Sequence, residues 1–106
     1  MRVLHYVDRR GHDLHQDWLD SLRDTMGRVA IQRRIDRIDN SGNLGLHDFC
    51  RDGVWELKID VGPGYRVYYA AVDKTTVLLL CGGAKRTQDR DITQAVKYWN
   101  DFQERA

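Results

Sequence analysis

Cationic side chains recur at set positions of a β-forming segment between residues 53 and 92. The segment alternates apolar and polar residues and carries four basic side chains of interest, Lys58, Arg66, Lys85 and Arg86. Period-two alternation is typical of strands that bury one face and expose the other. The sequence therefore predicts a sheet that displays cations, which would bind either a polyanion or an acidic protein.

This set of residues could cleave an RNA phosphodiester without a metal ion. The reaction needs a base for the 2′-hydroxyl, cations for the phosphorane and a proton donor for the leaving oxygen. Arg66 is the strongest candidate cation, because its planar and permanently charged guanidinium matches phosphate oxygens. Lys58 and Lys85 could assist it, or act as a base where a neighbouring cation lowers their pKa. Tyr68 could stack on a base or transfer a proton.

The same residues also fit a purely structural interpretation. Arg66 would then pair with Asp60, and Lys58 would pair with Glu56, so that the sheet presents a solvated and neutralised face. The residues by themselves leave this interpretation and the chemical one open.

Histidine and cysteine spacing favours no metal site. Four histidines occur, but His12 and His15 lack the i,i+4 spacing of helix-borne zinc pairs, so we expect surface or capping histidines. Cys50 and Cys81 also lack the spacing of metal ligands, and reduced thiols that pack in the interior are expected. We therefore expect neither a metal nor a cofactor.

Charges of opposite sign are segregated along the chain, although the net charge is only +1. Residues 13–24 carry four aspartates and one arginine, whereas residues 28–37 carry four arginines and one aspartate. A contact with nucleic acid would therefore depend on local patches. A row of arginines on a helix is most often a solvated face, and it could also meet RNA or an acidic partner. The residues expected to bind RNA or the ribosome are Arg33, Arg34 and Arg37, together with Arg51 outside this helix.

Apolar periodicity predicts one domain over residues 1–106 with the element order βααββββα. Residues 2–7 are typical of a first strand. Asp13 is placed to cap a helix with apolar positions from Leu14 to Met26, and a second helix follows it. Thr87 is the expected cap of the last helix.

This order predicts an α+β fold, with two N-terminal helices and a C-terminal helix on one face of a mostly antiparallel sheet. The other face would then carry the polar side chains of the central strands, Glu56, Lys58, Arg66 and Tyr68. No stretch approaches the roughly 18 apolar residues of a membrane span, so no membrane partner is expected.

One hairpin determines which polar side chains lie opposite each other. Its strands flank Gly62-Pro63-Gly64, and a three-residue loop would place Asp60 opposite Arg66. The same register would place Lys58 opposite Tyr68. Arg66 and Lys58 then share a face, and Asp60 is placed to neutralise Arg66.

Four motifs give the chain a resemblance to a known protein family. They are GNLG at 42–45, GVWELKI at 53–59, GPGYRVYY at 62–69 and LLLCGGAKRTQ at 78–88. Over essentially its whole length the chain resembles the phage-derived addiction-module killer branch of the RelE/HigB/ParE toxin superfamily. Ala84 stands where such proteins usually have an aspartate in a GGDK motif.

The resemblance implies a RelE-like fold and the toxin of a type II toxin–antitoxin module, neutralised by a cognate helix-turn-helix antitoxin. In RelE and HigB members the activity is metal-free cleavage of mRNA at the ribosomal A site. An mRNA interferase (an endoribonuclease) that is cytoplasmic and binds the ribosome and mRNA is therefore expected. The basic residues that contribute in those members map onto Arg66, Lys85 and Arg86, and Lys58 matches a basic strand position less closely.

Two features depart from the RelE pattern and leave other functions open. The chain is nearly neutral, whereas RelE-type nucleases are strongly basic, and its last helix offers only Tyr98 for the proton-transfer residue of some members. ParE members share the fold but poison DNA gyrase, and fold alone does not separate these outcomes. A gyrase poison and a non-catalytic binding module are therefore the alternatives to the nuclease.

Overall fold

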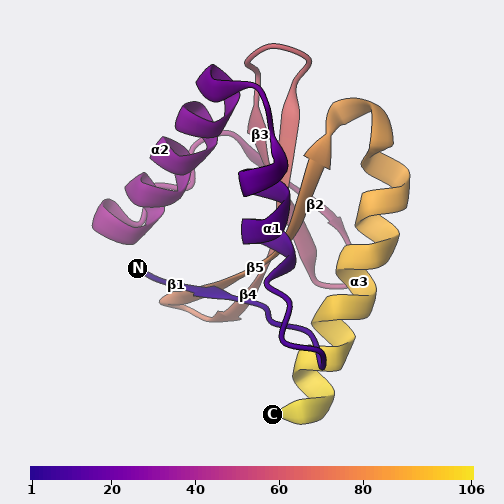
Figure 1. The fold of residues 1–106 in the computed structure, drawn as a ribbon. Helices are drawn as coiled ribbons and strands as arrows, with labels where there is room; N and C mark the ends of the chain where they lie inside the picture. Colours follow the sequence, from indigo (N-terminus) through magenta and orange to yellow (C-terminus); the bar gives the residue numbers. More distant parts are fainter.

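The computed structural model describes residues 1–106 and shows three α-helices around a five-stranded sheet (Figure 1). The elements in chain order are β1 (Arg2–His5), α1 (Leu14–Ser21), α2 (Thr25–Ser41), β2 (His47–Arg51), β3 (Val54–Ile59), β4 (Tyr65–Asp73), β5 (Thr76–Ala84), a 3-10 turn (Lys85–Thr87) and α3 (Gln88–Arg105). The predicted α+β class and the order βααββββα are confirmed.

The sheet has the strand order β1-β5-β4-β3-β2, so the first strand lies beside the last. β1 pairs with β5 in parallel, and every other neighbouring pair is antiparallel. The mostly antiparallel character predicted for the sheet is confirmed. None of the helices is long and apolar enough to cross a membrane.

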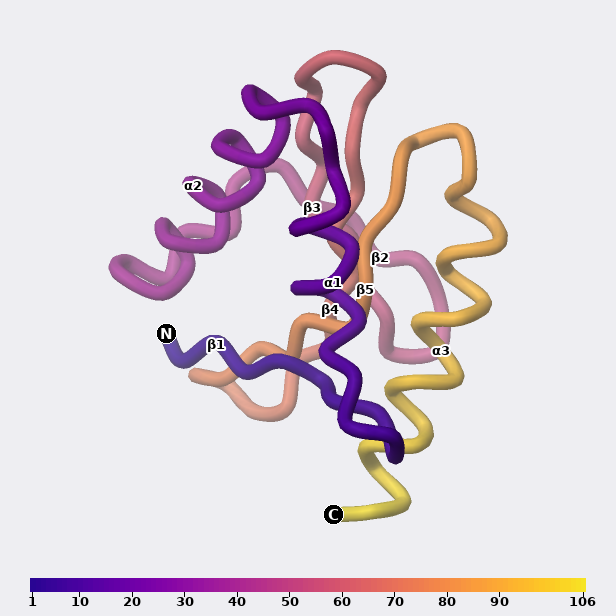
Figure 2. The backbone as a smooth tube through the Cα atoms, viewed as in Figure 1, coloured from indigo at the N-terminus to yellow at the C-terminus, as the bar shows by residue number.

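The helices cover both faces of the sheet, and the prediction of a single covered face is wrong. α1 and α2 bury one face, which includes Leu57, Val67 and Leu79. α3 buries the other face, which includes Tyr68 and Leu80, and Figure 2 shows it on the far side of the sheet from α2. The apolar run of β5 is typical of a strand buried on both faces, but the charged residues Glu56, Lys58 and Arg66 on β3 and β4 indicated an open face.

The β3–β4 hairpin is paired two residues away from the predicted register. Lys58 lies opposite Arg66, and Glu56 lies opposite Tyr68. The connecting segment covers residues 60–64, and Gly62 and Gly64 adopt positive φ there. Because the shift is an even number of residues, every side chain keeps the face that the alternation predicted.

A β-bulge in β5 changes the side-chain alternation in front of the last helix. Tyr68 pairs with Cys81 and Tyr69 pairs with Leu79, which leaves Leu80 without a partner on β4. Leu80 and Cys81 therefore both belong to the α3 side of the sheet. The thiol of Cys81 is buried, as predicted, and burial raises its pKa to about 12.

The two glycines after the bulge lie beneath side chains from opposite sides of the sheet. A Cβ on Gly82 would overlap the ring of Trp18 in α1. A Cβ on Gly83 would overlap the carboxylate of Asp91 in α3. The Gly-Gly pair therefore lets both helices approach the end of β5 closely.

The first helix is shorter than predicted, because an aspartate starts a new helix inside the expected one. α1 ends at Ser21, and Asp24 caps α2 by accepting a hydrogen bond from the Gly27 N–H at 3.0 Å. Met26, the last apolar position of the expected helix, is 77% exposed. The cap predicted at Asp13 is confirmed, since its carboxylate accepts from a backbone N–H of α1.

His15 is a core residue, which contradicts the expectation of surface or capping histidines. It is 1% exposed, and neither of its ring nitrogens has a hydrogen-bond partner. It packs against His5 and Trp18, and His5 in turn pairs with Asp13 at 2.7 Å. Burial, followed by the nearby His5, lowers the pKa of His15 to about 4.

The buried His15 should make the fold sensitive to acid. Its pKa is about 4 in the folded chain and 6.5 in the unfolded reference, so below pH 6.5 the unfolded chain binds the additional proton. We expect the free energy of unfolding to fall by about 3 kcal/mol between pH 7 and pH 4 through this residue. Urea unfolding at several pH values measures the loss. His15→Leu should remove this part of the pH dependence, and an unchanged dependence would contradict the assignment.

Candidate functional site

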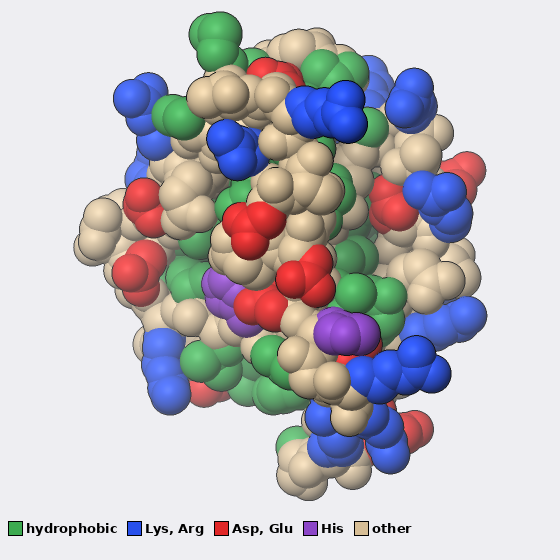
Figure 3. Space-filling model, viewed as in Figure 1, with side chains coloured by type: hydrophobic (Ala, Val, Ile, Leu, Met, Phe, Trp, Pro, Cys, Tyr) green, Lys and Arg blue, Asp and Glu red, His purple; other side chains and the backbone are tan.

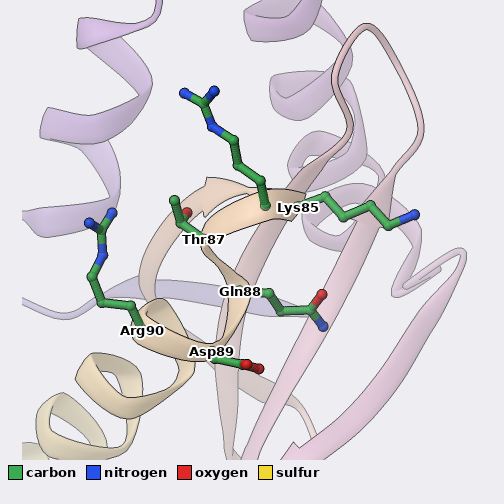
Figure 4. Close-up of a pocket in the computed structure, with 6 residues that line it drawn as sticks. Lys85, Thr87, Gln88, Asp89 and Arg90 are labelled. Atoms are coloured by element: carbon green, nitrogen blue, oxygen red, sulfur yellow. The ribbon is translucent and has the colours of Figure 1, made fainter.

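An open hollow of about 500 Å³ lies at the start of α3 (Figure 4). We call it the α3 hollow, and no hydrophobic side chain lines it; the lining residues are Lys85, Arg86, Thr87, Gln88, Asp89 and Arg90. Figure 4 shows Lys85 and Gln88 reaching toward the strands, whereas Arg90 points to the opposite side of the turn. The hollow is thus a polar surface with basic side chains on both sides.

The backbone at the α3 hollow is also suited to an anion. Thr87 occupies the predicted N-cap position, but its side chain caps no backbone N–H and instead donates to Asp91 at 2.6 Å. The first-turn N–H groups of α3 therefore have no side-chain cap, although the Gln88 N–H is bonded to the Lys85 carbonyl of the preceding 3-10 turn. These groups carry the positive end of the helix dipole, and the carboxylates of Asp89 and Asp91 lie in the same turn. Lys85 and Arg86 are exposed and form no ion pair, so their charges add to this positive end.

Arg66 lies below this surface rather than on it. The residue is 5% exposed, and its Nη1 donates to the Tyr65 carbonyl at 3.0 Å. Its Nε lies 3.8 Å from Glu56, and its Nη1 lies 3.8 Å from Asp60. The predicted proximity to Asp60 is confirmed, whereas the predicted solvent-facing position of Arg66 is wrong because α3 covers this face.

Lys58 lies directly opposite Arg66, and carboxylates separate the two like charges. Lys58 forms an ion pair with Asp48 on β2, not with Glu56 as the structural interpretation proposed. Like charges in a cross-strand pair destabilise a sheet unless they are neutralised. Asp48, Glu56 and Asp60 provide that neutralisation, so Lys58 is partly exposed but not free.

Glu56 connects the sheet to the start of α3. The residue is 4% exposed, and its carboxylate accepts hydrogen bonds from Gln88 Nε2 at 2.9 and 3.3 Å. The Arg66 guanidinium lies on the same carboxylate at 3.8 Å. A buried carboxylate requires such partners, and here they tie the floor of the α3 hollow to β3 and β4.

Tyr68 is fully buried beneath α3. Its hydroxyl has no hydrogen-bond partner, and burial, with the nearby Glu56 charge, raises its pKa. A side chain in this position cannot stack on an RNA base in the conformation observed. Tyr68 therefore packs the core on the α3 side.

The chain that carries this polar surface matches a phage-derived protein family. Residues 17–98 match the family described as "Phage derived protein Gp49-like". The chain belongs to the Gp49-like family. This is a family of addiction-module toxins, and an antitoxin partner follows from that membership.

A bacterial relative covers most of the same Gp49-like region. It is an uncharacterized protein of Haemophilus influenzae that is 46% identical over 78 residues. The matched region spans 74% of this chain and 78% of the relative. The similarity therefore extends through the greater part of both proteins.

The arginines of α2 do not join the α3 hollow in this Gp49-like chain, because α2 covers the opposite face of the sheet. Arg33 and Arg37 are exposed. Arg34, by contrast, donates to three backbone carbonyls, those of Lys58 at 2.5 Å, Leu44 at 2.8 Å and Leu46 at 2.9 Å. Arg34 thus holds the segment that leads into β2.

Replacing Arg34 with alanine should destabilise the fold, because the partly buried carbonyls of Lys58 and Leu44 lose the Arg34 donor, whereas the Leu46 carbonyl keeps the Lys58 N–H. A buried acceptor without a partner costs about 1–3 kcal/mol, and we expect a loss of about 2 kcal/mol in the free energy of unfolding. Urea denaturation measures it. Arg33→Ala, an exposed neighbour on the same helix, is the matched control and should change stability by less than about 0.5 kcal/mol. Equal effects of the two variants would contradict the assigned role.

Arg51 lies on the α3 side of the Gp49-like fold. It donates to Asp52 at 2.9 Å and to Thr93 in α3 at 3.1 Å. A second hollow of about 320 Å³ includes Arg51 together with Asp89, which also lines the α3 hollow. Of the four arginines predicted to bind RNA or the ribosome, Arg51 is thus the one that contacts α3.

Sequence reasoning missed the contributions of Glu56, Gln88 and Arg90. One signal was available in the sequence: the last helix begins directly after Lys85 and Arg86. The side chains of its first turn therefore lie around these two basic residues.

The charge distribution of the molecule fits a local site. In Figure 3 the cations are spread around the outline with carboxylates among them, as the net charge of +1 implies. The α3 hollow is therefore a local feature and not part of a basic face.

Proposed function

We propose that this Gp49-like toxin is a ribosome-dependent mRNA endonuclease of the RelE/HigB kind. It would cleave mRNA at the A site without a metal and be neutralised by a helix-turn-helix antitoxin. The observation that supports this proposal is the α3 hollow, where Lys85 and Arg86 carry unpaired charges at the start of a helix that no side chain caps. Phosphate groups bind at such positions.

The proposed reaction is a transesterification within the RNA. The 2′-oxygen loses its proton to a base and attacks phosphorus, the bond to the 5′-oxygen breaks, and the leaving oxygen takes up a proton. Negative charge accumulates on the phosphorane oxygens, and fixed cations stabilise that charge more than they stabilise the ground state. Lys85 and Arg86 would supply these cations, and Lys58 and Arg66 lie at the adjoining ends of β3 and β4.

Primer extension on mRNA in a translating extract tests this proposal. The purified chain, free of antitoxin, should produce new 5′ ends within codons at the ribosomal A site. The same RNA without ribosomes should remain intact. Growth arrest with uncut mRNA would overturn the nuclease, and inhibited DNA supercoiling in the arrested cells would instead indicate a gyrase poison.

A non-catalytic binding module is the second candidate, and the burial of Arg66 and Tyr68 favours it. These two residues are 5% and 0% exposed, so they do not reach a ligand in the conformation observed. This candidate predicts that expression without a partner causes no growth arrest. Toxicity of the chain expressed alone would rule it out.

A further inference from the structure

Two carboxylates of very different exposure hold the Arg66 guanidinium. The Glu56 side chain is 5% exposed and lies 3.8 Å from Nε. The Asp60 side chain is 70% exposed and lies 3.8 Å from Nη1. Arg66 is thus neutralised from inside by one carboxylate and from the solvent side by the other.

The inner carboxylate is held by hydrogen bonds, and the outer one is exposed and accepts none. Glu56 is held by the side chain of Gln88. Asp60 accepts no hydrogen bond, and it begins the segment 60–64 that connects β3 to β4.

The segment that carries Asp60 adjoins the α3 hollow. The Lys85 N–H donates to the Gly64 carbonyl at 3.0 Å, and the Lys85 side chain passes next to Gly64. Arg66 pairs with Gly83, two residues before Lys85 in the chain. Arg66 on β4 therefore lies between Asp60, which follows β3, and Lys85, which follows β5, so an anion that extends from Lys85 to Arg66 meets the carboxylate that covers Arg66 from solvent.

We propose that Asp60 is an internal substitute for a substrate phosphate. It occupies the Arg66 guanidinium in the free chain, and an RNA phosphodiester takes its place when RNA enters the α3 hollow. Carboxylate and phosphate oxygens accept the same hydrogen bonds from a guanidinium, so a phosphate can replace the Asp60 carboxylate at Arg66. The identification of the ligand as RNA rests on the proposed function, whereas the exchange at Arg66 requires only a phosphate.

Asp60→Asn tests the exchange, because it removes the competing charge and keeps the shape of the side chain. Inorganic phosphate is titrated into the purified chain, and the NMR signals of the Arg66 Nε–H and the Lys85 amide are followed. We expect about threefold to fivefold tighter binding in the variant, as for the loss of one exposed ion pair. Asp39→Asn removes the same charge from the last turn of α2 and should leave the Arg66 response unchanged. In an Arg66→Gln background, followed through the Lys85 amide, Asp60→Asn should no longer change the affinity for phosphate.

The outcomes separate this inference from the proposed function. Unchanged phosphate binding in Asp60→Asn, or an equal gain in Asp39→Asn, would overturn the exchange even if the chain cleaves mRNA on the ribosome. Tighter phosphate binding by Asp60→Asn without mRNA cleavage would support the exchange and contradict the nuclease. Tighter binding together with faster cleavage would support both.

Discussion

Replacing both Lys85 and Arg86 with alanine is expected to slow ribosomal mRNA cleavage by about 100-fold or more while the fold stays intact. Fixed donors and cations at a developing negative charge contribute about 10²–10³ in rate. Both side chains are exposed and form no ion pair, so their removal leaves no buried group without a partner. Primer extension over time measures cleavage, and urea unfolding shows whether stability is preserved.

A matched variant separates the site from the charge of the whole chain. Lys97→Ala combined with Arg10→Ala also removes one lysine and one arginine, both exposed and outside the α3 hollow. Cleavage by this control should remain near the wild-type rate. Equal losses in the two double variants would assign the effect to net charge, and undiminished cleavage without Lys85 and Arg86 would remove them from the proposed site.

Gly82→Ala is expected to lower the free energy of unfolding by about 3 kcal/mol, as overpacking in a core does. The added methyl group would overlap the six-membered ring of Trp18, and α1 would have to move away from β5. The result follows from packing alone and holds whatever the protein acts on. Urea unfolding and the temperature of thermal unfolding measure it.

A smaller residue in α1 should relieve the effect. In a Trp18→Leu background the space above Gly82 is larger, so Gly82→Ala should cost clearly less than it does in the wild type. The difference between the two costs is the coupling free energy of a double-mutant cycle. Equal costs in both backgrounds would show that Trp18 is not the obstacle.

The sequence was sufficient to predict the helices and strands and their order along the chain, because local signals decide both. Period-two alternation identified β3 and β4, and the carboxylate of Asp13 was recognisable as a helix cap. Family motifs were sufficient for the class of protein, since the match to the Gp49-like family covers residues 17–98. Lys85 and Arg86, named as candidate cations from the sequence, follow β5 directly in the 3-10 turn.

The surroundings of the charged residues were decided only by the tertiary structure. Arg66 and Tyr68 belong to a face that α3 covers, and no local pattern shows which face a distant helix will bury. Arg34, unlike Arg33, lies at helical spacing from the buried Ile31 and Ile38, but only the folded chain shows that its guanidinium meets three backbone carbonyls. The amino-acid sequence thus determined which cations this toxin carries and on which elements. Long-range packing determined which of them stay free to meet an anion, because burial and pairing depend on contacts between residues far apart in the chain.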